Sequence, residues 1–383
     1  MSPEADSSVL IVAGEASADA HGAKVLQCLR ERLPNLKCFG IGGERLKAAG
    51  LEIIADPAAL NVVGISEVFK GLGRIRKVFK TIQAEVEMRK PAVALLIDLP
   101  DFNLRLAKKL KRAGVNVVYY VAPQAWAWRK GRVRQIRRRV DKLCVVFPFE
   151  EPFFRQQAID VEFVGHPLCE ERIEQACSNE NKIVLLPGSR SREIQRLLPA
   201  IAGAAEILGK LNPDLQFVLA VAANLDRQLI EDQLQKARVK IKLTDASAQE
   251  TLAGARLAIA ASGTVTLEAA LAGVPLVVVY RVSRMTYALV RPIYRLKNIC
   301  IVNILAGREL VPELLQRKVR AQLIAEQAMG YLQDGSARKK VLTGLRAVVE
   351  NLGAGQPSLR VAEILIELLN QAKQAQGKDA DEN

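Results

Sequence analysis

The sequence predicts an α/β protein made of two doubly wound domains, each with a parallel sheet covered by helices. Short runs of β-branched and other apolar residues alternate with longer amphipathic stretches from one end of the chain to the other. The short runs are apolar at consecutive positions, which is typical of strands buried on both faces of a parallel sheet. The chain has 383 residues, 50% of them hydrophobic, which is enough for two to three domains and excludes intrinsic disorder.

The predicted strands form two sets, separated by a polar stretch near residues 167–182. The first set comprises residues 9–13, 38–41, 92–97, 115–121, 143–146 and 161–164, and the second comprises 183–186, 216–220, 240–243, 257–260 and 275–279. Amphipathic stretches predict helices over residues 103–113, 191–211, 225–237 and 265–272. We therefore expect domains over residues 1–168 and 180–345. A last helix, 358–370, carries an apolar stripe that needs a partner, and we expect it to pack on the first domain.

The amino-acid composition limits the kinds of partner and of metal site that the protein can have. The 55 basic and 41 acidic residues give a net charge of +14, which implies a polyanionic partner such as nucleic acid, a phosphorylated small molecule or an anionic membrane. Only two histidines are present and no two cysteines form a Cys-x-x-Cys pair, so we expect no metal site. The polar, acidic N-terminus predicts no signal peptide, and the most apolar region, 257–280, is interrupted by Glu268 and too short to span a bilayer.

The loop after the first predicted strand carries three groups that could do chemistry. Gly14 allows a sharp turn, and Glu15, Asp19 and His21 follow it. Ligands of doubly wound sheets bind beyond the carboxyl ends of the strands, so this loop is a candidate site. The alternative is a plain strand–turn–helix junction in which Ser17 or Asp19 caps the helix.

Two loops of the second domain predict phosphate binding. After the strand at 183–186, Gly188 permits close backbone approach, a helix N-terminus offers free N–H groups, and Ser189 and Arg190 add a hydroxyl and a positive charge. After the strand at 257–260, a second small-residue turn opens a helix; its members are Ser262, Gly263 and Thr264. Glu268 follows in an apolar helix and needs a partner, either a sugar hydroxyl or an amide or arginine of the same domain.

Eight blocks of sequence resemble the lipid-A-disaccharide synthase family, in the family's order and over about residues 9–370. They are GEASAD (14–19), NVVGISE (61–67), IDLPDFN (97–103), YYVAPQAWAWRKGR (119–132), VGHPL (164–168), LPGSR (186–190), ASGTVTLE (261–268) and NILAGRELVPELLQ (303–316). Ala18 and Ala122 depart from the family's usual Gly and Ser. The resemblance implies a glycosyltransferase of the B architecture, in which two Rossmann-like domains face each other across a cleft.

The resemblance also implies the reaction. Such enzymes join UDP-2,3-diacylglucosamine to 2,3-diacylglucosamine 1-phosphate, form a β-1,6-linked disaccharide and release UDP. They need no metal or other cofactor, and they sit peripherally on the cytoplasmic face of the inner membrane. Another UDP-sugar enzyme of the B architecture, an epimerase or a peptidoglycan glycosyltransferase, is the nearer alternative. A nucleic-acid-binding protein is the remoter one, and no helix-turn-helix, RNP or zinc-finger signature supports it.

Residue roles follow from the matched motifs. Asp98, at the end of a predicted strand, is the first choice for the base that deprotonates the acceptor hydroxyl, with Glu15 and Asp19 as competitors. Arg190 is the candidate for the diphosphate, together with the amides of Ser189 and 262–264, and Glu268 is the candidate for the ribose hydroxyls. By resemblance, a further segment faces the cleft without assigned roles; its candidates are Asn303, Arg308, Glu313 and Gln316. Ser17, in the loop after the first strand, is a further cleft candidate.

The charge excess is local. Residues 101–150 contain 13 basic and 3 acidic side chains, and the densest run directly follows two tryptophans. Rings that enter lipid headgroups and arginines that meet phosphates are typical of a membrane surface, although a solvated helix face is the ordinary alternative. The expected membrane or acyl-chain contacts are Phe69, Trp126, Trp128, Arg129 and Arg132. A third basic–aromatic stretch, 281–297, belongs either to the same surface or to a contact in a homodimer.

Overall fold

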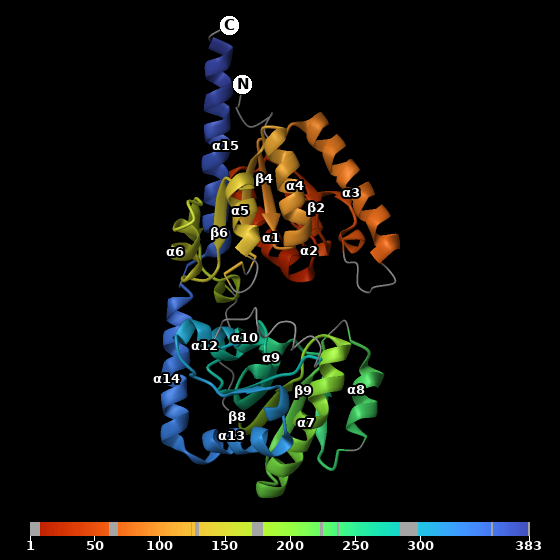
Figure 1. The fold of residues 1–383 in the computed structure, drawn as a ribbon, viewed down its shortest axis with the longest axis vertical. Helices are drawn as coiled ribbons and strands as arrows, with labels where there is room; N and C mark the ends of the chain where they lie inside the picture. The colour runs from red at the N-terminus through yellow and green to blue at the C-terminus, as the bar shows by residue number, and fades with distance from the viewer. Residues whose placement is uncertain are drawn as a thin grey trace. The chain divides into compact units, whose positions relative to one another are not determined.

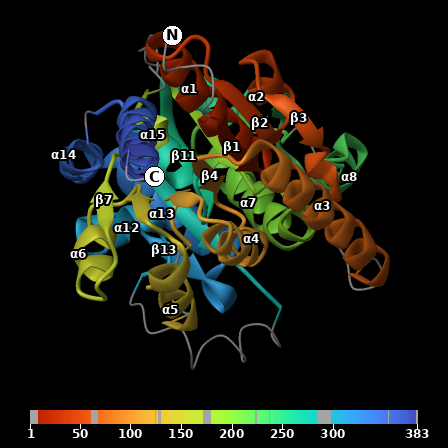
Figure 2. The same ribbon diagram turned by 90° about the horizontal axis from the view of Figure 1, so that it is seen from above.

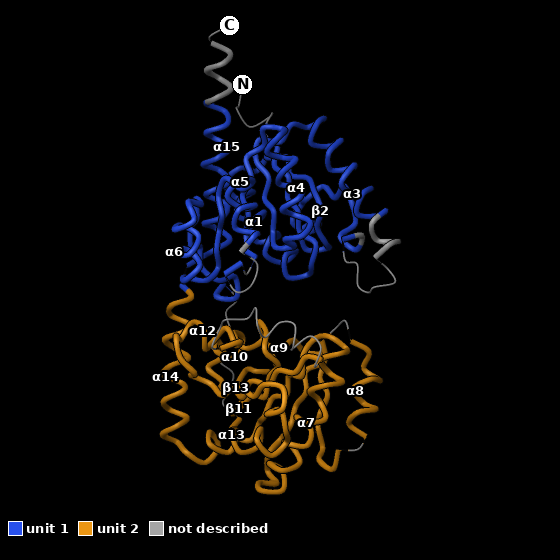
Figure 3. Tube along the Cα trace, in the orientation of Figure 1, with its two compact units in different colours: residues 1–170, 353–383 blue, residues 171–352 orange. Residues whose placement is uncertain are grey.

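The computed structural model describes residues 8–60, 68–123, 125–126, 130–170, 179–222, 225–235, 237–283, 298–353 and 355–381. The chain forms two compact units (Figure 3). Unit 1 comprises residues 1–170 and 353–383, and unit 2 comprises residues 171–352. The ranges predicted for the two domains, 1–168 and 180–345, lie inside these units.

Unit 1 is built on a sheet of seven strands in the order β3-β2-β1-β4-β5-β6-β7, and every pair is parallel (Figure 1). The strands are β1 (Ser8–Ala13), β2 (Lys37–Ile41), β3 (Glu52–Ala55), β4 (Val93–Ile97), β5 (Asn116–Tyr120), β6 (Lys142–Val145) and β7 (Val161–Phe163). All residues of β1 and β4 are buried, as expected for central strands covered on both faces. The strand order reverses between β1 and β4, which is where doubly wound sheets bind their ligands.

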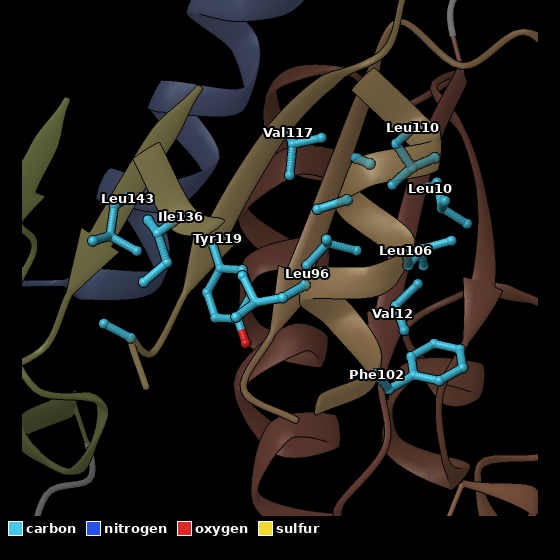
Figure 4. Close-up of a cluster of buried hydrophobic side chains, with 14 of the residues drawn as sticks. Leu10, Val12, Leu96, Phe102, Leu106, Leu110, Val117, Tyr119, Ile136 and Leu143 are labelled. Carbon is cyan, nitrogen blue, oxygen red and sulfur yellow. The ribbon is translucent and has the colours of Figure 1, made fainter. Parts of the chain in front are cut away.

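Helices cover both faces of this sheet. They are α1 (Ala16–Arg32), α2 (Glu44–Ala48), α3 (Val68–Arg89), α4 (Pro100–Arg112), α5 (Lys130–Arg139), α6 (Glu150–Arg155) and α15 (Pro357–Asp381). Figure 4 shows the core under α4 and α5, where Leu106 and Leu110 meet Leu10 and Leu96 of the strands. The last helix, α15, packs against α1, β4 and β5 (Figure 2), so the end of the chain belongs to unit 1.

Unit 2 repeats the plan with six parallel strands in the order β10-β9-β8-β11-β12-β13. The strands are β8 (Asn179–Leu186), β9 (Gln216–Ala220), β10 (Ile241–Thr244), β11 (Ala255–Ala261), β12 (Leu276–Tyr280) and β13 (Glu313–Leu315). The helices are α7 (Ser191–Leu211), α8 (Arg227–Leu234), α9 (Ala248–Leu252), α10 (Val265–Leu271), α12 (Ile301–Ala306), α13 (Ala321–Gln333) and α14 (Gly335–Asn351). Here the order reverses between β8 and β11. The predicted α/β class and the two doubly wound sheets are therefore confirmed.

Two strands were not predicted, and both lie at a sheet edge. β3 is exposed or half-buried at each of its four positions, and β13 has only three residues. Neither offers the continuous apolar run that marks a central strand. Among the described residues, the helices include none that is both long and apolar enough to cross a bilayer.

Candidate active site

In unit 1, the structure brings two of the predicted loops together at the switch point. β1 and β4 pair in register with Ala13 opposite Ile97, so the loops that begin at Gly14 and Asp98 leave the sheet at the same edge. A Cβ atom on Gly14 would lie 2.7 Å from Cδ2 of Leu99. Glycine at this position therefore allows the two loops to lie in contact.

Asp98 occupies a half-buried position at this edge. Burial raises the pKa of its carboxyl above the ordinary value, and the nearby charge of Glu15 raises it further; the N–H of Leu99 and the charge of Arg132 act in the opposite direction. Glu15 itself is exposed. A carboxylate whose affinity for protons is increased by its surroundings has the property that a general base requires.

Arg132, on α5, lies beside this carboxylate. Its guanidinium donates to Oδ1 of Asp101 at 2.7 Å, and its side chain is 14% exposed. This placement differs from the expected membrane contact, because an arginine that is largely buried and ion-paired has little free surface for a lipid headgroup. Arg132 instead supplies positive charge to the site around Asp98.

Asp19 has a structural role. Its buried carboxylate accepts hydrogen bonds from three backbone N–H groups at the start of α2: Gly43 (2.6 Å), Arg45 (3.0 Å) and Leu46 (3.1 Å). Its lone pairs are thus committed to another helix, which leaves it badly placed to take a proton from a substrate. The predicted capping of α1 by Ser17 or Asp19 is wrong, since the N-cap of α1 is Glu15 and no side chain caps it. Ser17 is exposed on the first turn.

Trp126 is tied to the interior of unit 1. Its indole Nε1 donates to Glu150 at 3.0 Å, and its ring meets Phe149 edge-on at 4.9 Å between centroids. Trp128 and Arg129 lie outside the described residues, and only the backbone of Phe69 is described, within α3. A tryptophan held in this way contributes to packing, so the membrane contact expected of this segment gains no support from Trp126.

In unit 2, the two predicted phosphate loops also begin at one edge. β8 and β11 pair with Leu186 opposite Ala260. Gly188 has a φ of 114°, which disfavours any other residue, and a Cβ there would lie 2.5 Å from Oε2 of Glu193. The same carboxylate accepts from the N–H of Ser189 at 3.3 Å and from Arg190 at 3.4 Å. Glu193 therefore contacts the groups expected to bind a phosphate, a role that its sequence position as a first-turn helix residue does not indicate.

The second loop of unit 2 presents small side chains ahead of α10. Gly263 and Thr264 are exposed, and Thr264 is the N-cap of the helix without a side-chain capping bond. A Cβ on Gly263 would meet no described atom within 4 Å, so the space in front of this turn is open within the described part of the chain. Glu268 is half-buried on α10. The N–H of Ser262 donates to the carbonyl of Val279 at 3.2 Å, so the predicted phosphate contacts of this turn are left to the amides of Gly263 and Thr264 and to the hydroxyls of Ser262 and Thr264.

Two of the residues implied to face a cleft, the buried Asn303 and the half-buried Glu313, bond to the backbone around them. Asn303 is 0% exposed; its Oδ1 accepts from Leu310 (2.8 Å) and Val311 (2.9 Å), and its Nδ2 donates to Glu313 at 2.7 Å. Glu313 also accepts from Ile299 (2.9 Å) and Cys300 (3.1 Å). The two side chains hydrogen-bond to the segments before and after α12 and so join this helix to β13. They accept from backbone N–H groups at residues 299–300 and 310–311 that have no partner in a helix or sheet.

The other two residues of that segment differ from each other. Arg308 is exposed beyond α12. Gln316, directly after β13, has a φ of 51°, and its carbonyl accepts from Arg281 at 3.2 Å. Arg308 is thus accessible to a ligand of unit 2, whereas Gln316 helps to shape the turn.

Two parallel, doubly wound units are the fold of the glycosyltransferase B architecture, which UDP-sugar epimerases also have. Solved structures agree: a UDP-GlcNAc 2-epimerase from Neisseria meningitidis bound to UDP-GlcNAc aligns with a TM-score of 0.62 at 14% identity, covering 94% of this chain and 99% of that one. MurG from Acinetobacter baumannii aligns with a TM-score of 0.58 at 12% identity, covering 94% and 99%. At such identities the likeness shows the fold alone.

Sequence comparison identifies the family. The profile described as lipid-A-disaccharide synthetase matches residues 9–363. A lipid-A-disaccharide synthase from Anaeromyxobacter dehalogenans (strain 2CP-C) is 43% identical over 373 residues, 94% of this chain and 97% of the relative. One from Geobacter metallireducens is 40% identical over 377 residues, 95% and 98% of the two chains. The chain belongs to the lipid-A-disaccharide synthetase family and is a glycosyltransferase, as the motifs predicted.

Proposed function

We propose that this enzyme transfers a glycosyl group, with inversion, from UDP-2,3-diacylglucosamine to 2,3-diacylglucosamine 1-phosphate. The products are the β-1,6-linked disaccharide 1-phosphate and UDP. The family match over residues 9–363 supports this reaction, and the observation that carries it in the structure is Asp98 at the switch point of unit 1, half-buried beside Glu15 and Arg132. The alternatives, a UDP-sugar epimerase or a peptidoglycan glycosyltransferase, share the fold but not the family.

The chemical step needs a base in unit 1. The 6-hydroxyl oxygen of the acceptor attacks the anomeric carbon of the donor, the bond from that carbon to the UDP oxygen breaks, and the hydroxyl proton passes to Asp98. Burial and Glu15 raise the proton affinity of Asp98, which favours this transfer. Asp98→Asn should therefore lower kcat by about 10²–10⁴-fold while UDP still binds to unit 2. Near-normal turnover in that variant would remove Asp98 from the role.

The leaving UDP needs positive charge and N–H donors in unit 2. We assign the diphosphate to Arg190 with the amides of Ser189, Gly263 and Thr264 and the hydroxyl of Ser262, and the ribose hydroxyls to Glu268. The side chain of Arg190 is 81% exposed, which leaves it free to follow a ligand. Such a site stabilises the developing charge without a metal ion. The activity should accordingly persist in EDTA, and a loss that Mg²⁺ restores would contradict this assignment.

We further propose that the enzyme binds peripherally to an anionic membrane on the cytoplasmic face of the inner membrane. The support is α5, where Arg134, Arg137 and Arg138 are exposed, while Arg139 is tied to the carbonyl of Leu104 at 2.8 Å. Replacing the three exposed arginines by Gln should weaken binding to vesicles of phosphatidylglycerol and phosphatidylethanolamine. A matched control with the same loss of charge, on α14 of unit 2, is the triple variant Lys339→Gln, Lys340→Gln, Arg346→Gln. Equal vesicle binding by the two variants would contradict the assignment of α5.

The reaction is tested directly with detergent-solubilised protein and both diacylated substrates. Release of UDP together with the disaccharide 1-phosphate is the expected outcome. An epimerase would instead change the sugar of the UDP substrate without an acceptor, and that product is detectable in the same mixture. Folded protein that forms no disaccharide would refute the proposed function.

A further inference from the structure

The backbone at the candidate base is strained. Asp98 and Leu99 have φ values of 48° and 46°, and among the described residues they are the only two adjacent non-glycine residues with positive φ. Non-glycine residues rarely adopt this left-handed region, and two in succession persist only where the surrounding structure holds them. The sequence could have placed a glycine at either position but does not.

Two fully buried side chains hold this backbone, and we call them the Asp98 clamp. Tyr119 of β5 donates its hydroxyl to the carbonyl of Asp98 at 2.6 Å. Asn103 of α4 donates its amide to the same carbonyl at 2.7 Å and to the carbonyl of Ile97 at 3.1 Å. Both side chains are 0% exposed, and the ring of Tyr119 lies in the core cluster of unit 1 (Figure 4).

The clamp acts on the peptide group between Asp98 and Leu99, whose N–H is bonded to the carboxyl of Asp98. The N–H of Asp98 donates to the carbonyl of Tyr120 at 3.0 Å, so β5 holds one side of the residue and the clamp holds the other. The direction of a side chain follows from the φ of its own residue. Relaxation of Asp98 to the ordinary extended region would therefore redirect its carboxylate. The carbonyls of Ile97 and Asp98 both accept from side chains that are themselves fully buried, so these bonds hold the backbone from the core side.

We infer that Tyr119 and Asn103 are positioning residues, which fix the direction in which Asp98 presents its carboxylate to the acceptor hydroxyl. The inference rests on the proposed role of Asp98 as the base. Misplacement of a reacting group by about 1 Å can cost on the order of 10²-fold in rate. The clamp should therefore affect kcat while leaving the binding of the donor nucleotide in unit 2 unchanged.

The next residue of β5 gives a matched control. Tyr120 is also 0% exposed, but its hydroxyl has no hydrogen-bond partner among the described residues. Tyr119→Phe and Tyr120→Phe thus remove the same atom from adjacent, equally buried positions. We expect kcat for Tyr119→Phe to fall roughly 10-fold or more, with the KM for the acceptor changed by less than about twofold, since this change removes no substrate contact. Tyr120→Phe should keep the wild-type kcat.

A second variant tests the clamp independently. Asn103→Asp keeps the size of the side chain but replaces the donating amide by an oxygen that faces two carbonyls. The expected loss in kcat is roughly 100-fold. Circular dichroism and thermal unfolding identify any variant that does not fold, and if Tyr119→Phe is such a variant, Asn103→Asp decides the outcome. A folded Asn103→Asp protein with wild-type kcat would overturn the inference.

Asp98→Asn separates failure of this inference from failure of the proposed function. If Asp98→Asn is inactive but Tyr119→Phe and Tyr120→Phe have the same kcat, the clamp is overturned and the base remains. If Asp98→Asn is active, both are overturned. Loss of activity in Asp98→Asn and in Tyr119→Phe, with an active Tyr120→Phe, is the result that supports the clamp.

Discussion

Replacing Glu150 by Gln should change the pH dependence of the stability of unit 1. Glu150 is 1% exposed, and burial raises its pKa from 4.5 to about 7, against hydrogen bonds from Trp126 and Phe147 that lower it. The folded state thus holds this proton more tightly than the unfolded state. Its contribution to stability is complete below about pH 4.5 and is lost as the pH rises through about 7, by about 3 kcal/mol in total.

Urea unfolding followed by tryptophan fluorescence measures this effect in unit 1 alone, because both tryptophans of the chain lie in residues 1–170. The quantity to follow is the free energy of unfolding of Glu150→Gln minus that of the wild type, from pH 5 to pH 9. Glutamine keeps an oxygen for Trp126 but cannot ionise. The difference should therefore move in favour of the variant as the pH rises, and should level off above about pH 8, beyond the pKa of Glu150.

His166 also makes the free energy of unfolding depend on pH, but it does so equally in the wild type and in Glu150→Gln, so it cancels in the difference between them. Burial and the nearby His21 lower the pKa of His166 from 6.5 to about 4, so its contribution to stability grows as the pH rises through that range. This slope opposes that of Glu150 and is present in both proteins. Glu151→Gln on the same helix serves as a control, since Glu151 is paired with Arg155 at 2.6 Å rather than buried. A difference for Glu150→Gln that is independent of pH would refute the reasoning.

Three further changes test the site. Glu15→Gln should move the acid limb of the pH profile of kcat/KM to lower pH, because Glu15 raises the pKa of Asp98. Arg132→Gln should move the same limb to higher pH, because Arg132 lowers that pKa. Shifts of the two variants in the same direction would contradict the assignment of this limb to Asp98. Glu193→Gln should tighten UDP binding by up to about 5-fold in calorimetry at low salt, since the Glu193 carboxylate competes with the diphosphate for Ser189 and Arg190. Weaker binding would mean instead that Glu193 orders the loop. Asp19→Ala should destabilise unit 1 by about 3 kcal/mol in urea, because three buried N–H groups lose their acceptor, and unchanged stability would refute that role.

The strands of both sheets could be predicted because their signal is local. Each of the eleven predicted strands overlaps an observed one, and the two that were missed, β3 and β13, are short edge strands. Gly188 likewise marked its loop, since its φ of 114° and the close approach of Glu193 require glycine at this strand end. The reversals of strand order at β1–β4 and β8–β11 bring these loops into pairs, as doubly wound topology requires.

The roles of individual polar residues could not be predicted, because their partners are backbone groups far away in the sequence. Asp19 binds amides 24 to 27 residues further on, and Tyr119 binds a carbonyl 21 residues earlier. The sequence does not distinguish a polar side chain that hydrogen-bonds to the backbone from one that binds a ligand. The motifs nevertheless contained the clamp, since Asn103 and Tyr119 both lie in blocks shared with the family, so family resemblance was the one available signal.

Asp19 and Asp98 were both candidates for the base, and their surroundings in the fold decide which of them can act as one. Asp19 is buried and accepts three backbone N–H groups, so its oxygens are already occupied in the folded chain. Asp98 is half-buried beside Glu15, which raises its affinity for a proton; its carbonyl accepts from Tyr119 and Asn103, and its carboxylate accepts from one backbone N–H, that of Leu99. A general base needs both a free lone pair and a defined direction. The clamp supplies the direction through the backbone and itself occupies no oxygen of the carboxylate, so positioning by the clamp is compatible with proton transfer to Asp98.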